Sequence, residues 1–358
     1  MNKKSEKFLF DYLNNASPTG YEAAGQKIWL DYIKPYIDEW GSDNYGTVYG
    51  VINPDADFKV VIEAHADEIG WRVNYISEKG LIYVIRNGGS DHIIAPSKRV
   101  NIHTDNNGVV KGIFGWPAIH TRKSKTEKTP SVDNIFIDVG ANSKEEVLEM
   151  GVNIGNTITF IDELEKLNGK YFVGRALDNR MGGFCIAEVA RMLKENKVKL
   201  PFGLYIVNSV QEEVGLRGAQ MITDTIKPNA AIITDVSHDT STPMIENKTY
   251  GEIECGKGPE LTFAPSVHNK LLKLILDAAD KNKIPYQRSA SSRSTGTDTD
   301  AFAYSNGGVP SALISLPLRY MHTTVEMAHK DDIDNVIKLI YHSLQNIDPD
   351  VSFKYFKN

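Results

Sequence analysis

Residues 59–67, Lys59-Val60-Val61-Ile62-Glu63-Ala64-His65-Ala66-Asp67, carry an apolar run directly into two side chains that can bind a metal ion. The run from 59 to 64 has the length and the β-branched residues of a buried strand. His65 ends it and Asp67 follows two positions later. In open α/β sheets ligands bind at the carboxyl ends of the strands, so the stretch predicts an α/β fold with polar groups gathered there.

The same order, a strand and then a potential ligand, recurs three more times along the chain. The apolar runs at 204–210, 231–234 and 312–316 lead to Glu212 and Glu213, to Asp235 and to His322. Asp178 is a further candidate, because it lies just before a predicted helix. Singly these residues have ordinary explanations: a His-x-Asp pair is often structural, a Glu-Glu pair is often solvated, and Asp178 could be a helix N-cap. Their joint placement at strand ends favours a common site.

The rest of the chain shows two kinds of secondary-structure pattern. The periodicity predicts helices at 181–195, 218–225, 268–282, 298–305 and 331–346, and Asp298 is expected to cap the fourth of these. Between them lie apolar strands, which together indicate a mostly parallel sheet with helices on both faces. Residues 71–163 instead hold six short β-rich runs and one short helix, a pattern that predicts an inserted small β-rich domain. The main α/β domain is then discontinuous, with residues 1–70 and 164–358.

The composition of the chain argues against two classes of partner, nucleic acids and membranes. The chain has 358 residues, enough for roughly two domains, and 40 Lys and Arg against 46 Asp and Glu give a net charge of −6. That balance argues against a nucleic-acid partner. The longest nearly uncharged runs are about ten residues, whereas a membrane span needs about twenty, so no membrane partner is expected. No signal peptide is visible and Cys185 and Cys255 are too few for a disulfide framework, which favours a cytoplasmic protein.

Two imidazoles and three carboxylates form a ligand set suited to zinc, cobalt or manganese. Two such ions about 3.5–4 Å apart can share one carboxylate and one water molecule and lower the pKa of that water. Adjacent Glu212 and Glu213 allow one carboxylate to bind metal while the other moves a proton.

These segments together resemble the M42 family of metallopeptidases, of the glutamyl and tetrahedral aminopeptidase type. The resemblance rests on stretches that occur in the family's order: 65–70 (HADEIG), 176–180 (ALDNR), 211–219 (QEEVGLRGA), 235–236 (DV), 296–298 (GTD) and 319–323 (RYMHT).

The resemblance implies a role for each candidate residue. Asp178 would bridge two divalent ions, zinc or cobalt with manganese as a further choice. His65 and Asp235 would complete the site of one ion, and Glu213 and His322 that of the other.

The catalytic residues implied are Glu212 and Asp67. Glu212 would be the general base that takes a proton from the metal-bridged water and passes it to the leaving amine, and Asp67 would orient the His65 imidazole. The insert, residues 71–163, resembles the family's dimerisation domain, so homo-oligomers are expected, with dimers assembling into a dodecamer.

The sequence therefore predicts a di-metal aminopeptidase that hydrolyses the N-terminal residue from short peptides. Two alternatives stay open. The same ligands could serve a related di-metal amidohydrolase, such as a deacylase or a carboxypeptidase. The chain could also be a non-catalytic assembly protein with a vestigial site.

Overall fold

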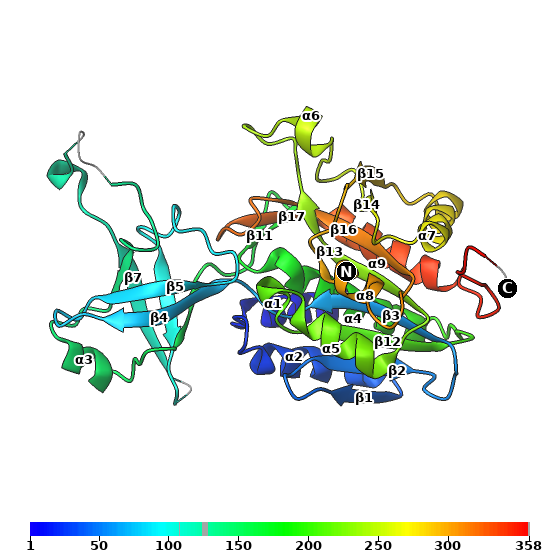
Figure 1. Ribbon diagram of the computed structural model, residues 1–358, viewed down its shortest axis with the longest axis horizontal. Coiled ribbons are helices and arrows are strands. Elements are labelled where there is room, and N and C mark those ends of the chain that lie inside the picture. Colours follow the sequence, from blue (N-terminus) through cyan, green and yellow to red (C-terminus); the bar gives the residue numbers. More distant parts are fainter. Residues whose placement is uncertain (107, 124–127, 357–358) are drawn as a thin grey trace.

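A mixed sheet dominates the computed structural model, which describes residues 1–106, 108–123 and 128–356 (Figure 1). Eleven strands form it in these residues, and β14 (Glu260–Phe263) and β15 (Gln287–Ala290) branch from the main path beside β16. The main path runs through β1 (Glu39–Ser42), β2 (Val48–Ile52), β12 (Gly203–Ser209), β3 (Lys59–His65), β13 (Ala230–His238), β16 (Ser311–Arg319), β17 (Glu326–His329), β11 (Tyr171–Gly174) and β10 (Glu165–Leu167).

The centre of this sheet is parallel, as the sequence predicts, and its margins are antiparallel. Strands β12, β3, β13 and β16 all pair in parallel, whereas β2 joins β12 and β17 joins β16 in the antiparallel sense. The register sets Ser209 opposite His65 and Ser315 opposite Asp235. Because the four central strands run in one direction, their carboxyl ends meet at one edge and bring their following residues together.

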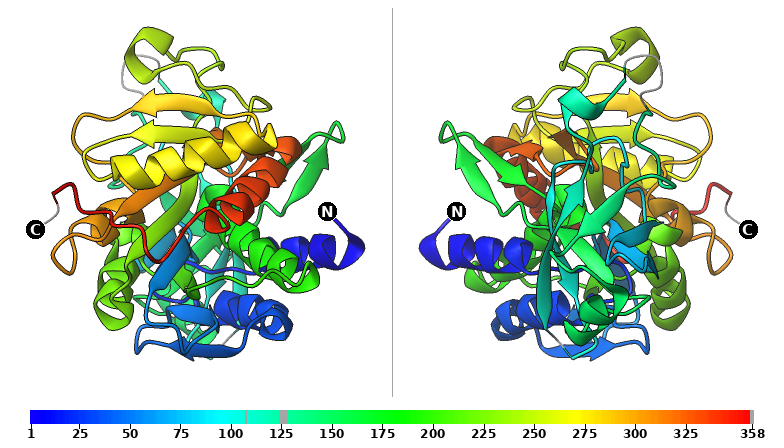
Figure 2. Two further views of the ribbon diagram at one scale, coloured as in Figure 1. Left: turned by 90° about the vertical axis from the view of Figure 1, so that its right-hand side faces the viewer. Right: turned by 90° about the vertical axis from the view of Figure 1, so that its left-hand side faces the viewer.

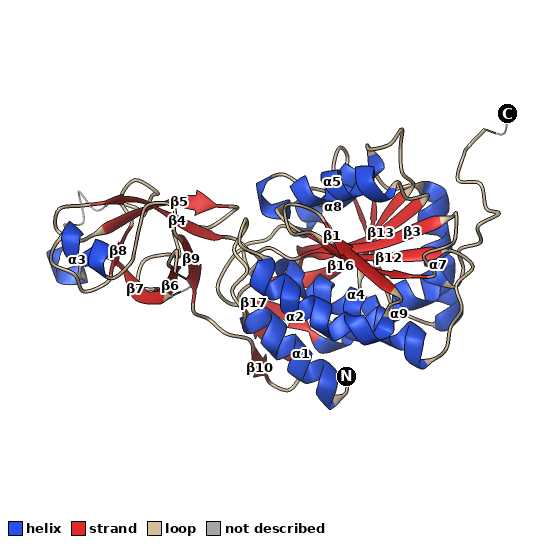
Figure 3. Ribbon diagram, turned by 90° about the horizontal axis from the view of Figure 1, so that it is seen from below, coloured by secondary structure: helices blue, strands red, loops and turns tan. Residues whose placement is uncertain are grey.

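Helices pack against the sheet in two layers. Figure 3 shows α5 (Arg217–Ile226) and α8 (Asp298–Ala303) on one side of it, and α1 (Lys3–Asn14), α2 (Ala23–Ile33), α4 (Leu177–Glu195) and α9 (Lys330–Leu344) on the other. Helix α7 (Asn269–Asn282) lies beside α9 in Figures 1 and 2 and packs against it. The short helices are η1 (Lys34–Tyr36), η2 (Ile119–Thr121), α3 (Lys144–Glu149), η3 (Glu212–Val214) and α6 (Asn247–Tyr250).

Helix α4 is the central helix of its layer and packs against α1, α2, α9 and β3. Most of its side chains are buried, and two glycines let neighbours approach it. A Cβ at Gly182 would lie 3.1 Å from Ala64 Cβ in β3, and one at Gly183 would lie 2.8 Å from the Tyr12 hydroxyl. This close packing holds the amino end of α4, which carries Asp178, over the carboxyl edge of the sheet.

A separate closed barrel stands at one end of the molecule (Figure 1). Its strands pair antiparallel around a core of its own that includes Trp71, Phe114 and Ile158. The strands fall on the six β-rich runs of the sequence, while the domain boundaries at residues 70 and 164 stay a prediction. In order around the barrel they are β4 (Gly70–Ile76), β5 (Ile82–Asn87), β8 (Phe136–Asp138), β7 (Val109–Gly115), β6 (Arg99–His103) and β9 (Thr157–Phe160).

Across the ranges that the structure describes, no helix combines the length and the apolar character needed to cross a bilayer.

The burial of β12 gives a test of the fold. Leu204 is fully buried in this central strand, whereas Leu167 in the edge strand β10 is 51% exposed. We expect Leu204→Ala to lower the free energy of unfolding by about 2–5 kcal/mol, because it removes buried methyl groups and leaves a cavity. The matched variant Leu167→Ala should change it by less than about 0.5 kcal/mol. Urea denaturation measures both, and equal losses would contradict the assignment of β12 to the core.

Candidate metal centre

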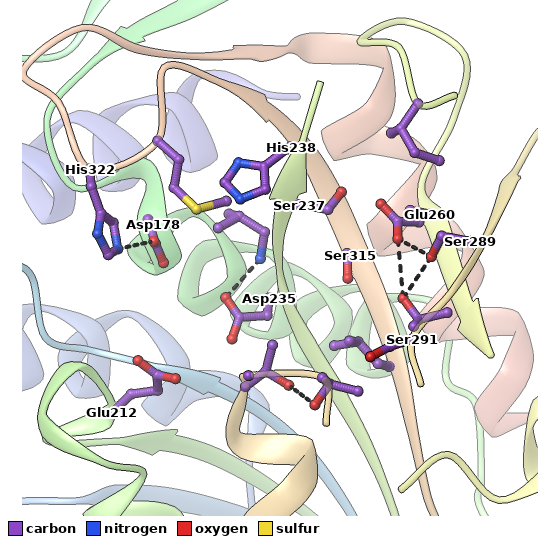
Figure 4. Close-up of a pocket in the computed structure, with 18 of the residues that line it drawn as sticks. Asp178, Glu212, Asp235, Ser237, His238, Glu260, Ser289, Ser291, Ser315 and His322 are labelled. Carbon is purple, nitrogen blue, oxygen red and sulfur yellow. Dashed lines mark hydrogen bonds and ion pairs between the residues drawn. The ribbon is translucent and has the colours of Figure 1, made fainter. Parts of the chain in front are cut away.

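All of the candidate ligands meet at the carboxyl edge of the central strands. His65 ends β3, Asp235 lies in β13, and Glu213 lies in η3 directly after β12. His322 follows β16, and Asp178 lies at the amino end of α4. Figure 4 shows Asp178, Glu212, Asp235 and His322 around one cavity.

Asp178 lies between the two imidazoles and offers one carboxylate oxygen to each. Its Oδ1 is 3.2 Å from His65 Nε2, and its Oδ2 is 3.2 Å from His322 Nε2. Asp235 Oδ1 lies 3.9 Å from His65 Nε2, and Glu213 Oε1 lies 3.6 Å from His322 Nε2. Two groups of three thus share Asp178, and in each group the potential ligand atoms lie within 4.8 Å of one another.

Glu212 lies beside this cluster. Its Oε2 is 3.9 Å from His65 Nε2, and it belongs to a third group of possible ligands with His65 and Glu213. Its side chain is 12% exposed, more than that of His65 or Asp178, and it lines the cavity. The structure thus places Glu212 where it can reach both the cluster and a molecule in the cavity.

Burial and mutual repulsion set the charges of these groups. Burial, opposed by His65 and reinforced by Asp178, raises the pKa of Asp235 to about 8. Burial and the charge of Asp178 raise the pKa of Glu213 well above its usual range. Burial, opposed by His65 and reinforced by Asp235, raises the pKa of Glu212 to about 10. Carboxylates that crowd together in this way cannot all be ionised unless a cation joins them.

The surroundings of the two histidines favour the charged form, whereas those of the three glutamate and aspartate side chains above favour the neutral form. Burial disfavours the charged form of His65, yet its hydrogen bonds to Asp178 and Asp67 hold its pKa well above the usual value. The hydrogen bond to Asp178 likewise raises the pKa of His322. Burial also opposes ionisation of Asp178, but these two imidazoles hold its pKa below the usual range. Asp178 and the two histidines thus favour one another's charged forms.

Asp67 holds several parts of the site together. Its Oδ1 lies 3.4 Å from His65 Nδ1 and accepts a hydrogen bond from the Glu212 amide at 3.0 Å. Its Oδ2 accepts hydrogen bonds from the Glu213 amide and from the Thr19 hydroxyl. This fully buried carboxylate thus fixes both the His65 imidazole at the end of β3 and the backbone of the two glutamates in η3.

Glu326 is a supporting residue that the sequence reasoning missed. It is buried in β17, and its Oε1 accepts from the His322 amide at 2.8 Å while its Oε2 accepts from the Asp178 amide at 3.1 Å. It therefore connects two of the candidate ligands through their backbones. The only signal in the sequence was its position four residues after His322. That spacing brings two side chains together in a helix, but Glu326 lies in a strand.

Asp298 supports the site in a different way from the one expected. The N-cap of α8 is Thr297, whose side chain accepts from the Thr299 amide, so Asp298 is not the cap. Its carboxylate instead lies 2.8 Å from the Ser209 hydroxyl, which is also 2.5 Å from Glu63 Oε1. Because Ser209 is paired with His65 across the sheet, this buried group forms a polar layer beneath that histidine.

The donor set fits a pair of divalent cations. It consists of imidazole nitrogens and carboxylate oxygens with no thiolate, which suits zinc, cobalt or manganese. One carboxylate serves both halves, and Asp67 approaches the other ring nitrogen of His65, as carboxylates commonly do for a metal-binding imidazole. A cavity of about 580 Å³ opens beside the cluster and gives a substrate access to it.

Comparisons with known proteins identify the family of this chain. The family model described as M42 glutamyl aminopeptidase matches residues 46–339. The lysyl aminopeptidase of Pyrococcus furiosus is 35% identical over 334 residues, which cover 92% of this chain and 94% of that protein.

Solved structures show the same architecture. The TET aminopeptidase of a marine sediment archaeon of the Thaumarchaeota superposes with a TM-score of 0.90 at 30% identity, covering 95% of both chains. The TET1 peptidase of Pyrococcus horikoshii gives a TM-score of 0.83 at 27% identity, covering 94% of this chain and 98% of that one. Because the family model spans most of the sequence and the match to an aminopeptidase extends over nearly all of it, this chain belongs to the M42 peptidase family and is a hydrolase of the aminopeptidase type.

Proposed function

We propose that this chain is a di-metal aminopeptidase that removes the N-terminal residue from short peptides. The observation that carries the proposal is the position of Asp178, which offers one oxygen to each of two imidazoles 3.2 Å away. Each half of the cluster then has its own carboxylate, Asp235 beside His65 and Glu213 beside His322.

The five residues would hold two ions, with Asp178 shared between them. Bound there, two divalent cations would polarise the scissile carbonyl and lower the pKa of a water molecule. Zinc and cobalt fit the donor set best, and manganese shares the same ligands.

Glu212 is the proposed general base. It lies at the edge of the cluster and faces the cavity, within reach of a water molecule held there and of a bound peptide (Figure 4). A carboxylate in this place can take the proton from the attacking water and deliver it to the leaving amine nitrogen. Asp67 is a positioning residue, because it binds the Glu212 amide and approaches His65 at once.

The open alternatives differ in their substrates. Membership in a hydrolase family speaks against a vestigial site, and the cluster retains a full set of candidate ligands. A deacylase or a carboxypeptidase would not require a free α-amino group next to the scissile bond. Cleavage of aminoacyl amides but not of their N-acetylated forms supports the aminopeptidase, and the reverse pattern contradicts it.

Substitution of the proposed base tests its role. Glu212→Gln keeps the size of the side chain but cannot accept the proton, so kcat should fall by at least about 100-fold. The bound metal, measured by elemental analysis, should stay near the wild-type amount. Near wild-type turnover in this variant would show that another group is the base.

Asp178→Ala tests the shared ligand. Because both halves of the cluster use this carboxylate, the variant should lose metal as well as activity, and added zinc or cobalt should not restore turnover. Elemental analysis after gel filtration measures the loss. As a matched control, Asp277→Ala removes an exposed carboxylate on α7 and should leave metal content and activity unchanged. Full metal occupancy in Asp178→Ala would rule out the bridging role.

We further propose that the barrel mediates dimerisation and that dimers assemble into a dodecamer. The barrel domain and its connections expose apolar side chains, among them Ile85, Val109, Ile113, Ile154 and Ile161, each between 39% and 65% exposed. The similar TET1 peptidase of Pyrococcus horikoshii is described as assembling into a tetrahedron or a large octahedral shell. The cytoplasmic location stays a prediction.

Particle mass tests the assembly. Light scattering should give about twelve times the 39.8 kDa of one chain. Ile113→Asp in the barrel should lower that mass, because it places a charge in the proposed contact. A monomer for the wild-type protein would contradict the proposal.

A further inference from the structure

The end of the cavity away from the histidines is polar and contains one carboxylate. Its lining includes Glu260 together with hydroxyl groups from Thr262, Ser289, Ser291, Thr297 and Ser315. In Figure 4, Glu260 and Ser289 lie across the cavity from Asp178 and His322, with Ser315 between Glu260 and Asp235. None of the roles discussed above uses this carboxylate.

The sheet register puts Glu260 in line with the candidate metal centre. Glu260 in β14 pairs with Ser315 in β16, and Ser315 pairs with Asp235 in β13. Residues directly opposite one another in a sheet present their side chains on the same face. Glu260 and Asp235 thus belong to one row, two strand spacings or about 10 Å apart between their backbones.

Glu260 is held in a way that leaves part of its carboxylate free for a ligand. Its side chain is only 7% exposed, and Oε1 accepts hydrogen bonds from the hydroxyls of Ser289 and Thr262. In the described part of the chain Oε2 has no hydrogen-bond partner, and no Lys, Arg or His forms an ion pair with Glu260. No lysine or arginine is among the described residues that line the cavity. A buried carboxylate without a cation is costly, so this oxygen favours a positively charged ligand group.

We propose that Glu260 selects substrates whose N-terminal residue is basic, lysine in particular. This inference rests on the proposed aminopeptidase function. With the scissile carbonyl beside Asp235, the first side chain of the peptide extends along the row toward Glu260. The four-carbon stem of lysine spans this distance past Ser315, and its ammonium group pairs with Oε2. An acidic side chain would meet the Glu260 charge and be rejected.

Norleucine provides a matched substrate, because it has lysine's stem without the ammonium group. We expect wild-type kcat/KM for lysyl-4-methylcoumarin amide to exceed that for the norleucyl analogue by about 10- to 100-fold, the usual range for a buried charged hydrogen bond. The glutamyl analogue should be the poorest of the three. Equal rates with lysine and norleucine would overturn the proposal, while the aminopeptidase function would stand. Failure to cleave any of these amides would instead count against the proposed function itself.

The variant Glu260→Gln assigns the preference to this residue. It preserves the size of the side chain and its contact with Ser289, but it removes the charge, so the lysine-to-norleucine ratio should fall to about 3 or less. Glu254→Gln is the control, because Glu254 is exposed on the segment that leads into β14 and does not line the cavity. It should keep the wild-type ratio. A wild-type ratio in Glu260→Gln would show that Glu260 does not contact the substrate.

Discussion

Repulsion between buried carboxylates is the constraint on which the rest of this structure depends. Asp178, Glu213 and Asp235 converge with Glu212 around only two imidazoles, in a place where burial already disfavours charge. Burying like charges together costs far more free energy than a single hydrogen bond returns, so such a cluster persists only where the surrounding fold enforces it. The same repulsion makes the cluster a strong attractor for divalent cations.

The fold holds the cluster in place through hydrogen bonds from backbone amides to two buried carboxylates. Asp67 accepts from the amides of Glu212 and Glu213, while Glu326 accepts from those of Asp178 and His322. These contacts connect η3, α4 and the segment after β16, which lie far apart in sequence. These hydrogen bonds make the loops that carry candidate ligands more rigid. Metal sites and catalytic groups require such rigid support.

The sequence predicted the parts of the site that follow from strand ends, and it failed where partners come from elsewhere in the fold. His65, Asp235 and Glu213 each follow a strongly apolar run, so their common edge could be expected. Glu326 and Glu260 lie in strands of four residues, too short and too polar to show a clear periodicity. Asp298 stands in a good capping position by pattern, yet Ser209 approaches it through tertiary packing that no local rule describes.

The closure of the barrel has a consequence for how the candidate metal centre is assembled. His65 and Asp178 stand 113 residues apart in sequence, a long loop for a pair that must meet. The barrel lies between them, and its first strand pairs with its last, with Trp71 opposite Ile158. In the folded barrel, the point where the chain enters therefore lies beside the point where it leaves. The folded barrel reduces the loop entropy that would oppose the meeting of these two candidate ligands, so an insert outside the candidate site helps that site to form.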